Sequence, residues 1–156
     1  MLLITVYRLL VTDTREWLVP CSLSFVSWQK ILGNLVGHIH NLAMIVHITT
    51  RTAWESAGTL YMADSLDSEG FIHCSTLEQV LLPANERFRG QTGLVLLCIE
   101  PARVTADIVY EDCYESGQKF PHIYGPLNKE AVTRVVDFPP NPDGTFSLPS
   151  QVAYGK

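Results

Sequence analysis

The sequence predicts an α+β fold, with a small, split, mostly antiparallel sheet and two or three helices. Capped helical segments come early in the well-patterned region, whereas several short apolar or β-branched runs follow late in the chain. This order is typical of α+β domains, because strictly parallel folds alternate a strand with a helix throughout. The length of 156 residues fits one domain, for which about 100–150 residues is usual.

Strands are expected where short apolar or β-branched runs occur. The run at 94–99 is apolar throughout, as is usual for a buried central strand. The predicted strands are residues 45–48, 60–63, 71–74, 94–99, 108–111 and 131–138. Between them, the polar segment DSLDSEG at 64–70 is interpreted as a loop, and PPNPDG at 139–144 is expected to break regular structure.

Two helices are expected from their capping residues. Thr50 follows the first strand and can accept a hydrogen bond from a backbone N–H at the start of a helix. Ser75 or Thr76 is expected to cap a second helix over residues 77–88, since Ser75 and a glutamate three residues later have the spacing of a capping box. Pro83 lies inside that segment and predicts a kink.

The composition changes at Met44. Residues 1–43 carry a net charge of +1, whereas residues 44–156 carry −6. The segment before Met44 also has few residues that mark turns, whereas strand and turn segments follow one another regularly after it. We therefore divide the chain into an N-terminal extension, a single α+β domain over 44–138 and a C-terminal tail over 139–156. Two interpretations of the extension stay open: upstream sequence read in frame before a natural start at Met44, or a genuine helix that packs on the domain.

Charge and cysteine usage exclude several classes of protein. The net charge is −5 and no long basic run occurs, so a long nucleic acid is not an expected partner. No uncharged apolar run of about 18 residues is present, so we expect no membrane span. The cysteines form no Cys-x-x-Cys pair, which favours a reduced, cytoplasmic protein. The sequence identifies no protein partner.

Three histidines on or beside short strands are the main candidates for chemistry. They are His47, His73 and His122, and each lies close to a Thr, Ser or Tyr. Because side chains of a strand alternate between its faces, His47 shares a face with Thr49, and His73 shares one with Ser75. A half-buried imidazole needs hydrogen-bond partners, so each ring is either satisfied within the protein or directed at a ligand.

Other assignments of these residues are weaker. Three histidines can form an open zinc site, but spacings of 26 and 49 residues match no local ligand motif. A Ser75–histidine nucleophile pair lacks a Gly-x-Ser-x-Gly elbow, and Ser75 is better explained as a helix cap. Cys74 has apolar neighbours and is expected in the core rather than as a nucleophile. No metal ligands are therefore assigned.

Several motifs together resemble the bacterial domain of unknown function 952 family. They are HIT, a following Trp, EGFIHCS, N-x-x-F, YE and FPHIYGPLN, in that order. The resemblance covers residues 45–138 and leaves residues 1–43 outside. It implies an uncharacterised function, because the family is defined by sequence rather than by activity.

A more distant resemblance is to the ADP-ribosyltransferase superfamily, including the NAD-dependent RNA 2′-phosphotransferases. It rests on the stretches His47-Ile48-Thr49, Trp54 and Ile72-His73-Cys74-Ser75. It implies an ADP-ribosyltransferase-like fold and a pocket for NAD, in which His47 binds a ribose hydroxyl and Tyr61 or Phe88 covers the nicotinamide. With Tyr124, which a rigid loop presents beside His122, the expected cofactor-binding residues are His47, Thr49, Tyr61, His73, Ser75 and Tyr124.

The sequence departs from that superfamily at the catalytic carboxylate. Where transferases place a glutamate, this chain has His122, which can act as an acid or base but cannot supply negative charge. The arginines and basic lobe of the RNA-processing relatives are also not evident, which again argues against a polymer substrate.

Three hypotheses follow for a small nucleotide-like ligand or substrate. The first is an ADP-ribosyltransferase-like transferase that acts on a small or protein substrate, with His47 and His122 as catalytic residues. The second is a non-catalytic nucleotide-binding module of the same fold. The third is a metal-dependent hydrolase that uses the three histidines. The sequence does not decide whether the protein is an enzyme.

Overall fold

The computed structural model describes residues 44–113, 115 and 117–153, and the prediction for residues 1–43 lies outside them. The first sheet of the described part has three antiparallel strands in the order β1-β4-β8. They are β1 (Ile45–Thr50), β4 (Leu94–Ile99) and β8 (Val132–Asp137). All six residues of β4 are buried, as expected for a strand with a neighbour on each side and a packed layer on each face.

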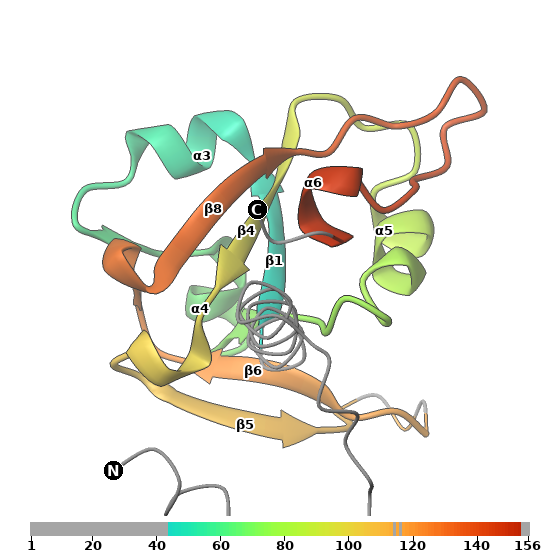
Figure 1. Ribbon diagram of the computed structural model, residues 1–156. Coiled ribbons are helices and arrows are strands. Elements are labelled where there is room, and N and C mark those ends of the chain that lie inside the picture. The colour runs from blue at the N-terminus through green and yellow to red at the C-terminus, as the bar shows by residue number, and fades with distance from the viewer. Residues whose placement is uncertain (1–43, 114, 116, 154–156) are drawn as a thin grey trace, which may run out of the picture. The chain divides into compact units, whose positions relative to one another are not determined.

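One face of this sheet packs against the helices α5 (Leu81–Arg87) and α6 (Ser150–Ala153), which Figure 1 shows on the same side of β1. Alternate residues of the strands supply this layer, since side chains along a strand point to opposite faces. The fully buried members of this core are Val46, Val80, Ala84, Leu96, Cys98, Phe138 and Val152. The chain after Phe138, expected as a tail, therefore contributes Phe146 and Val152 to the core.

The opposite face packs against two smaller antiparallel sheets. One pairs β2 (Leu60–Tyr61) with β7 (Leu127–Asn128). The other has the order β3-β6-β5 and comprises β3 (Ile72–His73), β6 (Phe120–Tyr124) and β5 (Asp107–Glu111). Figure 1 shows β5 and β6 running across one end of the first sheet. An isolated bridge between Val46 and Ser75 joins the two layers at the backbone.

The remaining elements are short and connect the sheets. They are the helices α3 (Arg51–Ser56) and α4 (Asp64–Ser68) and the 3₁₀ turns η1 (Pro101–Arg103) and η2 (Lys129–Ala131). The Nζ of Lys129 donates to the carbonyls of Trp54, at 2.8 Å, and Ala57, at 2.7 Å. These carbonyls lie at the end of α3, where a cation is favourable because of the helix dipole.

The small α+β fold with mostly antiparallel sheets is confirmed, and β4 has the predicted bounds. Three predicted segments are wrong. The rigid loop expected at His122 and Tyr124 is the strand β6. Residues 64–68 form α4 instead of a loop, because Asp64 and Asp67 in its first turn favour a helix N-terminus. The second helix begins at Leu81, and Ser75 is not its cap but a backbone partner of Val46. Pro83 falls in the first turn of α5, where no N–H is needed and no kink results.

The predicted cap of α3 is present and provides a stability test. The Oγ1 of Thr50 accepts a hydrogen bond of 3.1 Å from the backbone N–H of Ala53. Replacing Thr50 with alanine is expected to lower the free energy of unfolding by about 1 kcal/mol, as measured by urea denaturation. Thr52→Ala is the matched control, because Thr52 is exposed in the same helix and makes no such bond. Equal losses for the two variants would contradict the capping role.

Candidate functional site

A pocket of about 430 Å³ opens where β1 meets α5, α4 and the β3-β6-β5 sheet. Its volume lies in the usual range of ligand sites, about 300–1,000 Å³. Six of the predicted site residues line it, namely His47, Thr49, Tyr61, His73, Ser75 and His122. Phe88, proposed as a cover for nicotinamide, is also part of the wall. Tyr124 is not among the lining residues. The three histidines, separated widely in sequence, thus converge on one pocket.

His47 is the centre of a buried hydrogen-bond chain. Its Nδ1 lies 2.6 Å from the carbonyl oxygen of His73, and its Nε2 lies 3.0 Å from the Tyr61 hydroxyl. The Tyr61 hydroxyl is in turn 2.8 Å from the Oγ1 of Thr49. Burial lowers the pKa of His47 to about 4, although the bond to the His73 carbonyl opposes this shift. The imidazole is therefore neutral at pH 7.

Because the imidazole of His47 is neutral, the donor and the acceptor of each hydrogen bond in this network can be assigned. A carbonyl can only accept, so Nδ1 carries the proton of His47 and Nε2 must accept from Tyr61. The single proton of Tyr61 is then used, and the hydroxyl of Thr49 donates to the Tyr61 oxygen. Both nitrogens of His47 are thus engaged inside the protein, and the residue is only 7% exposed. Direct contact of His47 with a ribose stays a prediction.

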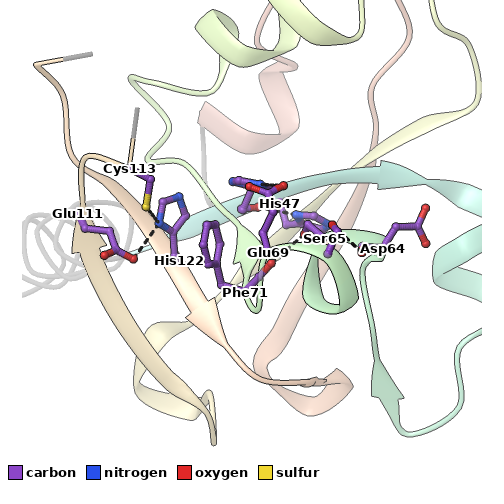
Figure 2. A network of polar contacts seen from close by, with 10 residues as sticks. His47, Asp64, Ser65, Glu69, Phe71, Glu111, Cys113 and His122 are labelled. Atoms are coloured by element: carbon purple, nitrogen blue, oxygen red, sulfur yellow. Dashed lines mark hydrogen bonds and ion pairs between the residues drawn. The ribbon is translucent and has the colours of Figure 1, made fainter. Parts of the chain in front are cut away.

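His122 is held from two sides. Its ring stacks on Phe71 with a centroid distance of 4.3 Å, and Figure 2 shows Phe71 on one side of the ring with Glu111 and Cys113 toward the other. Nδ1 lies 3.2 Å from the Oε1 of Glu111 and 3.6 Å from the Sγ of Cys113. Burial lowers the pKa of His122, and its bond to Glu111 opposes that shift. The carboxylate can only accept, so neutral His122 donates from Nδ1 and keeps a lone pair on Nε2.

Tyr124 supports this arrangement from outside the pocket. Its hydroxyl donates to the same Oε1 of Glu111 at 2.5 Å. This bond, followed by that from His122, lowers the pKa of Glu111, while it raises the pKa of Tyr124 to about 12. Tyr124 therefore keeps Glu111 ionised and positioned, and contact between Tyr124 and a cofactor stays a prediction.

Two polar atoms of the pocket wall are free to meet a ligand. Within the described part of the chain, the Nε2 of His122 and the Oγ of Ser75 have no hydrogen-bond partner, although these residues are only 2% and 5% exposed. No fully buried side-chain nitrogen or oxygen of the described residues lacks a partner. These two atoms must therefore keep accessible surface, and both residues line the pocket.

Charged residues at the pocket were missed by the sequence analysis. Asp64, Glu86 and Arg87 line it together with apolar side chains of α5. Asp64 lies close enough to Tyr61 to contribute to the raised pKa of that phenol, which burial causes in the main. The available signal was the acidic first turn of α4, which was interpreted as a solvated loop. Asp64 and Glu86 thus place negative charge at the pocket, although His122 stands where transferases have a glutamate.

The nitrogens of His47, His73 and His122 do not converge on a common point where a metal ion could bind. The nitrogens of His47 are directed at His73 and Tyr61, while the Nε2 of His73 lies 3.1 Å from the Oε1 of Glu69. Among the described residues, the one group with metal-ligand spacing is instead Glu111, Cys113 and His122, whose ligand atoms lie within 4.8 Å of one another. Cys74 is buried in the core, as expected, and burial raises the pKa of its thiol.

The fold and the site together define a small α+β protein with mostly antiparallel sheets and a pocket lined by histidines. Its residues 46–135 match the family described as "Protein of unknown function (DUF952)", and the chain belongs to that family. The match confirms the family resemblance seen in the sequence.

Solved structures of one relative agree with this assignment. The crystal structure of protein CC0527 from Caulobacter crescentus is 34% identical, with a TM-score of 0.64, over 70% of this chain and 98% of that chain. The solution NMR structure of CC0527 is 35% identical, with a TM-score of 0.58, over 66% of this chain and 90% of that chain. CC0527 is described as a structural genomics target.

These comparisons leave the finer functional expectations open. No curated protein matches the chain. None of these matches is described as an ADP-ribosyltransferase, so the resemblance to that superfamily stays a hypothesis. Within residues 44–113, 115 and 117–153, no helix is both long enough and apolar enough to cross a membrane.

Proposed function

We propose that the pocket binds a small nucleotide-like ligand of the NAD type and supports ADP-ribosyl-transfer-like chemistry on a small or protein substrate. The observation that carries this proposal is the open Nε2 of His122 in a largely apolar pocket that is also lined by the hydroxyl-bearing residues that His47 orients. Ligand sites commonly combine apolar walls with a few fixed polar groups that set orientation.

The polar groups suit the parts of such a ligand. His47 holds the hydroxyls of Tyr61 and Thr49 in one direction, so that their oxygens can accept hydrogen bonds from sugar hydroxyls, and preorganised acceptors of this kind bind without a large ordering cost. Arg87 is the basic residue of the wall and suits a phosphate, because a guanidinium donates several hydrogen bonds to one anion. The apolar side chains of α5 suit an aromatic base or the nicotinamide ring.

The chemistry requires a proton acceptor and negative charge near the ribose. When the bond between nicotinamide and ribose breaks, positive charge develops on the sugar and is stabilised by nearby carboxylates. Asp64 and Glu86 provide carboxylates at the pocket. The lone pair on the Nε2 of His122 can accept the proton of an attacking hydroxyl or water, since Glu111 holds the proton of the ring on Nδ1.

Calorimetric titration with NAD, ADP-ribose and AMP, paired with chromatographic detection of released nicotinamide, tests this function. Binding of NAD with release of nicotinamide is the expected result. Binding without release would support the non-catalytic module instead and overturn the transfer chemistry. The absence of any nucleotide binding would overturn both.

Tyr61→Phe provides a sharper test of the oriented hydroxyls. Removing the phenol oxygen is expected to weaken ADP-ribose binding about 5–10-fold, the usual worth of one neutral hydrogen bond. Tyr110→Phe is the matched control, because Tyr110 is exposed on β5 and is not among the lining residues of the pocket. Equal affinity of both variants for ADP-ribose would exclude a role for Tyr61 in binding.

A further inference from the structure

A second group of side chains lies on the far side of His122 from its open nitrogen. Glu111 is the last residue of β5, Cys113 follows it by two positions, and His122 is in the middle of β6. Antiparallel pairing of β5 with β6 brings the three together. A nitrogen, a sulfur and an oxygen ligand atom then lie within 4.8 Å of one another.

The spacing of these atoms matches a tetrahedral zinc site. Zinc lies about 2.0–2.1 Å from a histidine nitrogen and about 2.3 Å from a cysteine sulfur, so tetrahedral geometry separates the two ligand atoms by about 3.6 Å. The observed distance from the Nδ1 of His122 to the Sγ of Cys113 is 3.6 Å. The same geometry places nitrogen and carboxylate oxygen about 3.3 Å apart. The observed distance to the Oε1 of Glu111 is 3.2 Å.

Neighbouring residues hold two of these ligands in place. Phe71 stacks on the His122 ring and fixes its plane, and Figure 2 shows the imidazole directed at the carboxylate and the thiol. The hydroxyl of Tyr124 donates to Glu111 and orients its carboxylate. Hydrogen bonds and packing of this kind around the ligands raise metal affinity and commonly account for a factor of about 10–100.

The local charge also favours a cation. Cys113 is exposed, and the negative charges of Glu111, Asp112 and Glu69 all act on it. A dication compensates this concentration of negative charge and stabilises the thiolate, which is the form that coordinates zinc. The exposed position of Cys113 gives a metal ion access from solvent.

We propose that Glu111, Cys113 and His122 form a zinc-binding site with a fourth position open to solvent. On binding, the thiol of Cys113 releases its proton to solvent, and the ring proton of His122 moves from Nδ1 to Nε2. The site shares His122 with the proposed nucleotide function but uses its Nδ1, whereas that function uses Nε2. Neither proposal requires the other.

The test uses the full chain and metal ions alone, with no nucleotide present. Competition against a chromophoric chelator is expected to give one zinc equivalent with a dissociation constant below the micromolar range. Substitution with Co²⁺ is expected to give a thiolate-to-cobalt charge-transfer band and intense visible bands of a four-coordinate ion. Millimolar or non-stoichiometric binding, or a cobalt spectrum without sulfur ligation, would overturn the site.

Variants assign the metal to these residues. Cys113→Ser is expected to abolish the charge-transfer band. Cys113→Ser and Glu111→Gln are each expected to weaken zinc binding more than about 10-fold, because even the loss of a residue that only hydrogen-bonds to a ligand commonly costs about 10–100-fold. Glu130→Gln is the matched control, because Glu130 is an exposed acid of η2 outside the group. Cys113 is exposed, so its replacement does not disturb the core. Unchanged zinc binding by both ligand variants would show that the metal binds elsewhere and would refute the proposal.

Discussion

Replacement of His122 by phenylalanine is expected to lower the rate of nicotinamide release about 10²–10⁴-fold, the usual contribution of a positioned acid or base. Phenylalanine keeps a ring that can stack on Phe71 but removes both nitrogens. Affinity for ADP-ribose should fall no more than about tenfold, because only one neutral hydrogen bond is lost. The rate effect should therefore exceed the binding effect.

Single-turnover measurements with excess protein and chromatographic detection of nicotinamide check this expectation. Near-ultraviolet circular dichroism establishes that the variant is folded, and His122→Ala provides a second, smaller replacement if phenylalanine is not accommodated. A folded variant that releases nicotinamide at the original rate rules out His122 as the proton acceptor. A loss of affinity as large as the loss of rate would indicate a binding role alone.

Acidification from pH 7 to pH 4 is expected to remove about 3 kcal/mol of folding stability through His47 alone, since a pKa difference of one between the folded and unfolded states corresponds to about 1.36 kcal/mol. The pKa of His47 is lowered from 6.5 to about 4 in the folded protein, because burial disfavours the charged ring. The unfolded chain therefore binds this proton more readily. The contribution of His47 is fully present above pH 6.5 and is lost as the pH falls through 4.

Urea denaturation at a series of pH values measures this loss, and His47→Gln separates it from the titration of other groups. The variant is expected to be less stable at pH 7, since it cannot reproduce both bonds of the imidazole. Its stability should then fall less steeply toward pH 4 than that of the parent protein. Parallel pH profiles for the two proteins would falsify the assignment of this loss to His47.

Much of the fold could be predicted because its strands carry a strong local signal. The segment 94–99 is apolar at every position, and the structure buries every one of its residues. The alternation of faces grouped His47 with Thr49, and both side chains contact the hydroxyl of Tyr61. In such segments the apolar character of each residue directly predicts whether its side chain is buried.

The elements that were missed depend on less local information. The acidic run at 64–68 is short and polar, and its helical state depends on charges in the first turn and on the bond from Ser65 to the carbonyl of Phe71. Ser75 has the spacing of a helix cap, but pairing with Val46 places it in a bridge between layers. Local capping rules could not identify this competing tertiary partner.

Six residues of the pocket wall could be predicted, but the contacts between them could not. The pairing of β3 with β6 places His73 opposite His122, and no sequence pattern specifies this register. The same holds for the approach of Glu111 and Cys113 to His122, which depends on the pairing of β5 with β6. Without the register, the rings of His47 and His122 could not be assigned their different roles.

The imidazole of His122 couples zinc binding at Nδ1 to ligand binding at Nε2. One nitrogen faces the pocket and the other faces Glu111 and Cys113, and a neutral imidazole carries a single proton for both. Zinc on Nδ1 would force that proton onto Nε2 and convert an acceptor into a donor. The metal and a ligand that requires an acceptor would therefore oppose each other, and each would lower the affinity of the other by the same factor. Zinc would act as an antagonist of any reaction that uses His122 as a base.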